Sequence, residues 1–346
     1  MKVTASPFGS YHDGTKANLI TIDSAYGSVS FTDFAASIVS VAVPDKDGNM
    51  GDVVLGLDDG PAYQQHGGSL GAICGRFANR LVGSVVKLGG VEYGLDKNHD
   101  LFTLHGGSDG FNKRIWDFVT DDKGVTFSLR SPDGDQGFPG NMDVSVRYEF
   151  SDDGVLSIDY WAKSDKDTPA NFTNHAYFNL SGHDSGDAHQ LLQINGGFFN
   201  PQLRGQLPSG EVRFVEGTVM DFRTERDAAE ASMSDDELIV VAGGLDHNFL
   251  LNKSERGALE YAGSLRSASA GRKMEVYTTM PAMMIYAANS MHMEGKGGAQ
   301  YRPWGAICME CQNVPDSMRH THFPSPVLKA GEEYTARTEY RFLTDK

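Results

Sequence analysis

Short segments in which apolar and polar residues alternate recur along this chain. Val144, Val146 and Tyr148, for example, are separated by single polar residues. A period of two places successive side chains on opposite faces of a strand and is typical of antiparallel sheets with one buried face. Segments of this kind, bounded by Gly, Asp, Asn or Pro, span residues 37–44, 124–132, 142–150, 155–163 and 273–281. The pattern predicts an all-β protein.

Turn and helix signals complete this prediction. Residues 151–156, Ser-Asp-Asp-Gly-Val-Leu, are typical of a hairpin turn between two of the strands. A helical pattern is confined to residues 226–242, which we expect to form one or two short helices, with Ser234 and Glu237 as a capping box. No repeat or clear linker interrupts the chain. Residues 1–346 are therefore predicted to form a single domain, a large antiparallel β-sandwich with a few short helices.

The net negative charge of the chain argues against some classes of binding partner. Lys and Arg number 30 against 46 Asp and Glu, a formal net charge of −16 at pH 7. Such a surface repels nucleic-acid phosphates and anionic lipids, so we expect neither nucleic acid nor membrane as a partner, and a neutral or cationic small molecule fits better. The first residues, MKVTASPFGSYHDG, lack the apolar core of a secretory signal, and no apolar stretch is long enough to span a bilayer. These features predict a cytoplasmic protein.

Cysteine and histidine patterns argue against a metal or redox site. The three cysteines, Cys74, Cys308 and Cys311, are too few for a disulfide scaffold. Cys308 and Cys311 have the spacing of a redox or zinc motif, but their surroundings are strand-like, and strand positions three apart point to opposite faces. His320 and His322 would share a strand face without an adjacent third ligand. Because phosphate-binding and nucleophile-elbow motifs are also missing from the sequence, we expect neither a metal nor a cofactor.

Two predicted strands carry side chains suited to acid–base chemistry. In residues 171–180, alternation places His175 and Tyr177 on one face and apolar residues on the other. In residues 305–317, Glu310 projects from a strand with bulky apolar neighbours, which raises the pKa of a carboxyl group toward the range of a general base. The alternatives are a solvated or structural histidine and a buried glutamate in a structural hydrogen-bond network.

Glycine-flanked segments supply potential ligands for hydroxyl groups. Asn79, Arg80 and His105 are potential donors, and the glycines beside them let the backbone approach a ligand. Asp246 follows a glycine turn and could accept hydrogen bonds from sugar hydroxyls. The alternatives are turn glycines with a surface arginine, and an aspartate that caps a turn.

Together these segments resemble the ordered motifs of one family, the aldose 1-epimerases or galactose mutarotases. The resemblance extends roughly from residue 18 to residue 343 and rests on five motifs, GRFANR (75–80), LHGG (104–107), TNHAYFNLSG (173–182), LDHNF (245–249) and MECQNVPDS (309–317). It implies the galactose mutarotase-like supersandwich, in which two large antiparallel sheets pack in one domain and leave an open cleft for a sugar. It also implies an isomerase that interconverts the α and β anomers of free hexoses, such as galactose and glucose, without a cofactor.

The resemblance assigns a role to each candidate residue. It makes Glu310 the general base and His175 the general acid. Four further residues would bind the sugar hydroxyls or support the general acid, namely Asn79, Arg80, His105 and Asp246. Tyr177 would contact the sugar ring. The partner would be a small-molecule sugar, and the protein a monomer or a homodimer.

One segment departs from the family pattern. Met280 and Met284 stand where the family pattern has glutamines, in a segment that usually makes a polar contact with the sugar. This departure leaves the preferred sugar open.

Three alternatives to a free-hexose epimerase stay open at this level. A hexose-6-phosphate 1-epimerase would need Lys and Arg side chains that converge on the phosphate. A non-catalytic sugar-binding protein would keep the hydroxyl-binding groups but would not need both Glu310 and His175. A retaining glycosidase using Glu310 and Asp246 would need their carboxyl groups roughly 5–5.5 Å apart.

Overall fold

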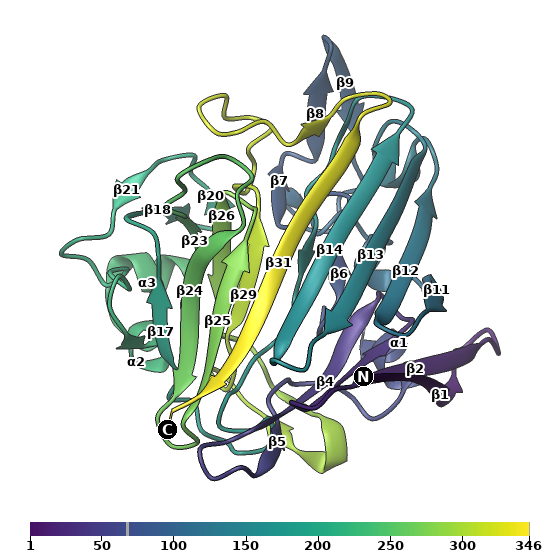
Figure 1. Cartoon of the computed structure of the whole chain (residues 1–346). Coiled ribbons are helices and arrows are strands. Elements are labelled where there is room, and N and C mark those ends of the chain that lie inside the picture. The colour runs from purple at the N-terminus through teal and green to yellow at the C-terminus, as the bar shows by residue number, and fades with distance from the viewer. Residues whose placement is uncertain (67–68, 346) are drawn as a thin grey trace.

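Antiparallel strands make up most of the computed structural model, which describes residues 1–66 and 69–345 (Figure 1). The largest sheet has nine strands, all paired with antiparallel neighbours. In spatial order they are β11 (Asp117–Thr120), β12 (Gly124–Ser131), β13 (Met142–Phe150), β14 (Val155–Ser164), β31 (Glu333–Thr344), β25 (Arg272–Thr278), β24 (Glu260–Ser267), β17 (Leu191–Ile194) and β22 (Arg226–Asp227).

Two five-stranded sheets accompany the largest one. The first contains β1 (Lys2–Ser10), β2 (Lys16–Asp23), β3 (Ser28–Thr32), β4 (Ser37–Pro44) and β5 (Met50–Asp52). The second, which we call the site sheet, contains β21 (Arg213–Phe214), β18 (Phe198–Asn200), β23 (Asp246–Leu250), β26 (Ala282–Tyr286) and β29 (Cys308–Gln312). The strands predicted at residues 37–44, 124–132, 142–150, 155–163 and 273–281 are therefore present, the last one ending at Thr278, and the all-β fold class is confirmed.

Short ribbons and helices complete the described part of the chain. Six two-stranded ribbons pair β7 (Arg80–Val82) with β10 (Phe102–Leu104), β6 (Ile73–Cys74) with β16 (Thr173–Asn174), β8 (Val85–Leu88) with β9 (Val91–Gly94), β15 (Thr168–Pro169) with β30 (Val327–Leu328), β19 (Gln202–Leu203) with β20 (Leu207–Pro208), and β27 (Met293–Glu294) with β28 (Gln300–Tyr301). The α-helices are α1 (Gly60–His66), α2 (Ala228–Ser232) and α3 (Glu237–Ala242), and short 3-10 helices span Phe111–Lys113, Asp135–Gly137 and Lys296–Gly298. Among the described residues, none of the helices is both long and apolar enough to cross a bilayer.

The sheet β1–β5 contributes Ile22, Phe31 and Val41 to the core, and another part of the core lies between the nine-stranded sheet and the site sheet. Apolar side chains from both, including Val146 and Ile158 on one side and Phe249, Ile285 and Met309 on the other, belong to one cluster of buried residues. In Figure 1, β29 of the site sheet is seen behind β25 and β31, and β18 and β21 lie to the left of β24. Because strand side chains alternate, the neighbours of these core residues on the site sheet face away from the core, and that opposite face carries the candidate site.

The predicted strand over residues 171–180 is mostly wrong. Only Thr173–Asn174 pairs as a strand, with β6. The side-chain oxygen of Asn174 accepts a hydrogen bond from the backbone N–H of Ala176 at 3.0 Å, and such a local bond competes with strand pairing. The predicted division of side chains nevertheless holds. The apolar residues of the segment enter the core cluster, and Tyr177 packs in a separate cluster on the other side.

The predicted helix cap also needs correction. Residues 226–242 do contain two short helices, α2 and α3, but Ser234 does not cap α3. Asp236 is the cap, since its carboxylate accepts a hydrogen bond from the Leu238 N–H at 2.9 Å. Ser234 instead accepts from the Asp236 N–H at 3.1 Å and so shapes the turn before the helix. Asp236 lies closer than Ser234 to the first turn of α3, so its carboxylate can accept a hydrogen bond from a free N–H group of that turn.

His320 and His322 do not share a strand face, because both lie in the turns that follow β29. The three cysteines are buried and free. Cys308 packs in one cluster and Cys311 in the main core, as expected for strand positions three apart.

Candidate active site

All seven residues singled out in the sequence line one cleft with a volume of about 280 Å³. They come from chain segments far apart in sequence and are Asn79, Arg80, His105, His175, Tyr177, Asp246 and Glu310. The cleft lies on the face of the site sheet that points away from the core. The fold therefore brings together every candidate that sequence reasoning identified.

Glu310 and His175 face each other in this cleft. Oε1 of Glu310 lies 3.5 Å from Nε2 of His175, and their side chains are 2% and 8% exposed. The other carboxyl oxygen, Oε2, has no hydrogen-bond partner among the described residues. Burial raises the pKa of Glu310 to about 8, with a further contribution from the nearby charge of Asp246. Burial also lowers the pKa of His175 to about 4, so the cleft favours the uncharged form of both groups.

Neighbouring rings hold the plane of the His175 imidazole. Tyr177 stacks on it with ring centroids 5.0 Å apart, and His105 contacts it edge-on at 5.3 Å. The backbone N–H of His175 donates to the Ala72 carbonyl oxygen at 2.9 Å. These contacts leave the imidazole little freedom to turn, so Nε2 is held toward Glu310.

Arg80 and Asp246 form a buried ion pair beside the acid–base pair. Nη2 of Arg80 lies 3.0 Å from Oδ2 of Asp246, and the two side chains are 8% and 6% exposed. Nη1 of Arg80 donates to the side-chain oxygen of Asn79 at 3.3 Å. The planar guanidinium is thus fixed by two partners, an arrangement that suits a group meant to present its remaining donors to a ligand.

Asn79 and His105 are held by bonds to each other. The Asn79 N–H donates to Nδ1 of His105 at 3.2 Å, and the His105 N–H donates to the Asn79 carbonyl oxygen at 3.0 Å. Both residues have positive φ, 67° and 51°, a conformation that non-glycine residues adopt rarely and mostly where function requires it. Burial lowers the pKa of His105 well below its usual value. Because Nδ1 is an acceptor, the hydrogen of neutral His105 is on Nε2.

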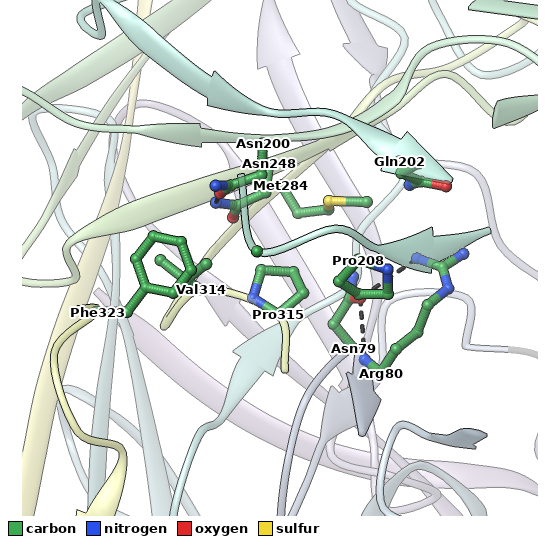
Figure 2. A pocket seen from close by; sticks show the side chains of 11 residues that line it. Asn79, Arg80, Asn200, Gln202, Pro208, Asn248, Met284, Val314, Pro315 and Phe323 are labelled. Carbon is green, nitrogen blue, oxygen red and sulfur yellow. Dashed lines mark hydrogen bonds between the residues drawn. The ribbon is translucent and has the colours of Figure 1, made fainter. Parts of the chain in front are cut away.

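Met284 interrupts a polar row on the site sheet. The register of neighbouring strands aligns Asn200, Asn248, Met284 and Glu310 across one face. Figure 2 shows the Met284 side chain extending between Asn248 and Gln202, in a narrow pocket beyond the cleft. The pocket shares Asn79 and Arg80 with the cleft. A thioether therefore lies directly opposite the buried carboxyl group, at the position where the family resemblance leads us to expect a glutamine.

Met280 has no part in the cleft. Its side chain belongs to the main core, and the Tyr334 hydroxyl donates to its sulfur at 3.7 Å. Of the two departures from the family pattern, only Met284 borders the site.

Sequence reasoning missed five of the residues that line the cleft, Ser69, Leu104, Gln206, Tyr286 and Ser290. Tyr286 could have been found, because it lies two positions after Met284 and so on the same strand face. Gln206 lies in the turn between β19 and β20, and no motif marks it.

Within residues 1–66 and 69–345, no group of three or more His, Cys, Asp or Glu side chains is arranged to hold a metal ion. In the cleft, Glu310 is paired with His175 and Asp246 is paired with Arg80.

Comparisons with known proteins point to one family. The aldose 1-epimerase family model matches residues 18–341. The aldose 1-epimerase of Escherichia coli K12 is 37% identical over 338 residues, 96% of this chain and 97% of that protein. The galactose mutarotase of Bos taurus is 37% identical and covers 91% of this chain and 90% of its own length. Among solved structures, an aldose epimerase homologue from C. elegans superimposes with a TM-score of 0.88 at 28% identity, over 95% of this chain and 100% of that one.

Proposed function

The chain belongs to the aldose 1-epimerase family and is therefore an isomerase that interconverts sugar anomers. From this premise we propose its substrates and its catalytic residues. Its substrates are free hexoses such as galactose and glucose. Glu310 is the general base and His175 the general acid. The observation that carries the proposal is the 3.5 Å approach of the two groups within one cleft, far apart as they are in sequence.

Mutarotation needs two proton transfers. Glu310 removes the proton from the C1 hydroxyl while Nε2 of His175 gives a proton to the ring oxygen. The bond between C1 and the ring oxygen breaks, and its electrons go to the oxygen as the aldehyde forms. Rotation about the C1–C2 bond presents the other face of the carbonyl, and both transfers then run in reverse. Each group must serve as acid and as base in one cycle.

The two pKa shifts suit this exchange. In the free enzyme near neutral pH the pair holds its proton on Glu310 and both groups are neutral. The proton must therefore pass to His175, which makes both groups charged, before the ring opens. Once the ring has opened, the proton is on Glu310 and both groups are neutral. Burial raises the pKa of Glu310 and lowers that of His175, so the cleft favours the neutral pair. The charged pair that starts the reaction is therefore a state of higher free energy, and ring opening returns the pair to the favoured neutral state.

The remaining side chains fit a neutral polyol. Arg80, Asn79 and the Nε2–H of His105 donate, and Asp246 accepts, at the positions where hydroxyl groups would lie. Tyr177 supplies an aromatic surface for the apolar face of the sugar ring. Of the described residues that line the cleft, Arg80 is the only lysine or arginine, and it is already paired with Asp246. This favours a free hexose over a hexose phosphate.

Polarimetry tests the proposal. Purified protein is added to freshly dissolved α-galactose and α-glucose, and the approach to anomeric equilibrium is compared with the uncatalysed rate. Acceleration with both hexoses, and little with glucose 6-phosphate, is expected. Faster turnover of glucose 6-phosphate would favour the phosphate-specific alternative. Binding of galactose by calorimetry without any acceleration would favour a non-catalytic sugar-binding protein.

A further inference from the structure

The second ring nitrogen of His175 contacts a thiol. Sγ of Cys308 lies 3.5 Å from Nδ1, on the side of the ring opposite the Nε2–Glu310 contact. Cys308 and Glu310 are two positions apart in β29 and so project from the same face of the strand. One strand therefore contacts both nitrogens of the imidazole, and the thiol is fully buried.

The proposed reaction requires a particular tautomer of neutral His175. When the imidazolium gives its Nε2 proton to the ring oxygen, the electron pair of that N–H bond stays on Nε2 and the hydrogen on Nδ1 remains. The return transfer needs the free Nε2 pair to stay in the cleft. A hydrogen-bond acceptor at Nδ1 secures this, because the bond that one imidazole nitrogen makes decides which nitrogen carries the proton.

Both groups near Nδ1 can act as that acceptor. The carbonyl oxygen of His175 itself, which accepts only, lies close enough to raise the pKa of the imidazole. Cys308 is the other group, and a thiol sulfur is a weak acceptor. Burial raises the pKa of the Cys308 thiol well above its usual value. The sulfur is therefore uncharged and leaves the imidazolium acidic, unlike a carboxylate in the same position.

We propose that Cys308 is a positioning residue of the acid–base pair, whose sulfur accepts the Nδ1 hydrogen of His175 and so keeps Nε2 directed at the sugar and Glu310. The inference rests on the proposed function for its effect on rate, but the tautomer itself does not depend on it. The other titratable or charged groups around the imidazole are His105, Tyr177, Tyr286, Asp246 and Arg80.

The tautomer can be measured directly. The full-length protein is labelled with ¹⁵N-histidine, and side-chain ¹H–¹⁵N correlation spectra are recorded at pH 7, where His175 is neutral because its pKa is about 4. His175→Asn identifies the resonance. In the wild type we expect the hydrogen on Nδ1. In Cys308→Ala we expect a mixture of both tautomers, with kcat lower by about 10-fold and KM unchanged, the scale typical of lost outer-shell hydrogen bonds.

Cys311 offers a matched control on the same strand. Cys311→Ala removes an equally buried thiol from the opposite face, so the His175 tautomer and kcat should match the wild type. Cys308→Ser keeps an acceptor at the position and should retain part of the rate and most of the Nδ1–H form.

Two results would overturn the proposal. One is a wild-type spectrum with the hydrogen of neutral His175 on Nε2. The other is a Cys308→Ala protein whose tautomer or kcat equals that of the wild type, which would leave the backbone carbonyl as the sufficient acceptor. If Cys308→Ala does not fold, the wild-type and Cys308→Ser spectra decide. A wild type with the Nδ1–H form but without mutarotase activity would instead contradict the proposed function.

Discussion

Two buried side chains with opposite pKa shifts share one transferable proton. Burial keeps Glu310 protonated up to a pH of about 8 and His175 neutral down to about 4. Between these limits the pair holds a single proton, which the reaction passes between the two groups. Below them it holds two protons and has no base, and above them it holds none and has no acid. The titrations belong to the coupled pair rather than to either residue alone.

The pH dependence of kcat/KM follows from this count. For the free enzyme we expect a plateau in which the pair is singly protonated, with activity falling as pH rises through about 8 and as it falls through about 4. Polarimetric rates in overlapping buffers across this range provide the measurement. An alkaline limb near the ordinary pKa of glutamate would show that Glu310 is not held in a desolvated site.

Replacing Glu310 separates stability from activity. A carboxyl group whose pKa rises from 4.5 to about 8 on folding makes the free energy of unfolding decrease as pH rises between these values, because the folded state binds the extra proton. Glu310→Gln lacks this ionisable group. We expect it to lose catalysis yet to melt at a higher temperature than the wild type at pH 8, with the difference shrinking toward pH 5. Thermal melts at both pH values, beside polarimetry, check the pair of outcomes.

Replacing His175 tests the acid alone. His175→Asn should lower kcat by at least about 10²-fold, the usual contribution of a positioned proton donor. His12, which is exposed, supplies the control, since His12→Asn should leave kcat unchanged. A kcat close to the wild-type value in His175→Asn would make the histidine structural.

At the scale of a strand, the site sheet decides what surrounds Glu310. Its alternation sends one set of side chains into the core and the other into the cleft, and its register places Met284 directly opposite Glu310. Directly opposed side chains in an antiparallel pair lie within contact distance. The thioether thus adds to the burial of the carboxyl group and offers it no hydrogen-bond donor.

A glutamine at position 284 should change the titration of Glu310. The amide N–H₂ of Met284→Gln can donate to the ionised carboxylate, which lowers its pKa. We expect the alkaline limb of kcat/KM to move to lower pH than in the wild type. Met280→Gln is the matched control, because Met280 also departs from the family pattern but lies in the core. The alkaline limb of kcat/KM for Met280→Gln should stay at the wild-type pH. Identical limbs for Met284→Gln and wild type would exclude an influence of this strand neighbour.

At the scale of the whole molecule, Arg76 ties the segment that ends in Asn79 and Arg80 to distant loops. It is 2% exposed, and its guanidinium donates hydrogen bonds to several acceptors in residues 131–140, including the carbonyl oxygens of Ser131, Pro139 and Gly140 at 2.8 Å. Burial lowers its pKa to about 10, so it stays charged at neutral pH. The cleft therefore depends on contacts made well outside it.

Removing this guanidinium should destabilise the whole fold. Arg76→Ala leaves several buried carbonyl oxygens without donors, and we expect the free energy of unfolding to fall by about 3 kcal/mol or more. Arg76→Lys keeps the charge but not the planar set of donors, so it should recover only part of the loss. Urea denaturation of the three proteins gives the comparison. Equal midpoints for Arg76→Ala and wild type would contradict this role.

Much of the architecture was predictable because it depends on local pattern. The period of two along residues 142–150 and 155–163 reflects burial of one strand face, and both segments are strands in the structure. Within residues 171–180, the same alternation correctly placed His175 and Tyr177 on the side of the cleft and the apolar residues in the core. It failed there on the backbone, because the Asn174 side chain competes for the hydrogen bond that a strand would need.

The sequence by itself determined the strand pattern, which follows from residue type and spacing. It also determined the family resemblance, and through that resemblance the candidate acid, base and hydroxyl ligands. Only the tertiary structure decided that Met284 opposes Glu310, that Cys308 contacts the far side of His175, and that Met280 lies away from the cleft. These relations depend on strand register and on packing between segments more than a hundred residues apart, such as His175 and Cys308. Register and packing are set by the burial of the whole core, which no local pattern specifies.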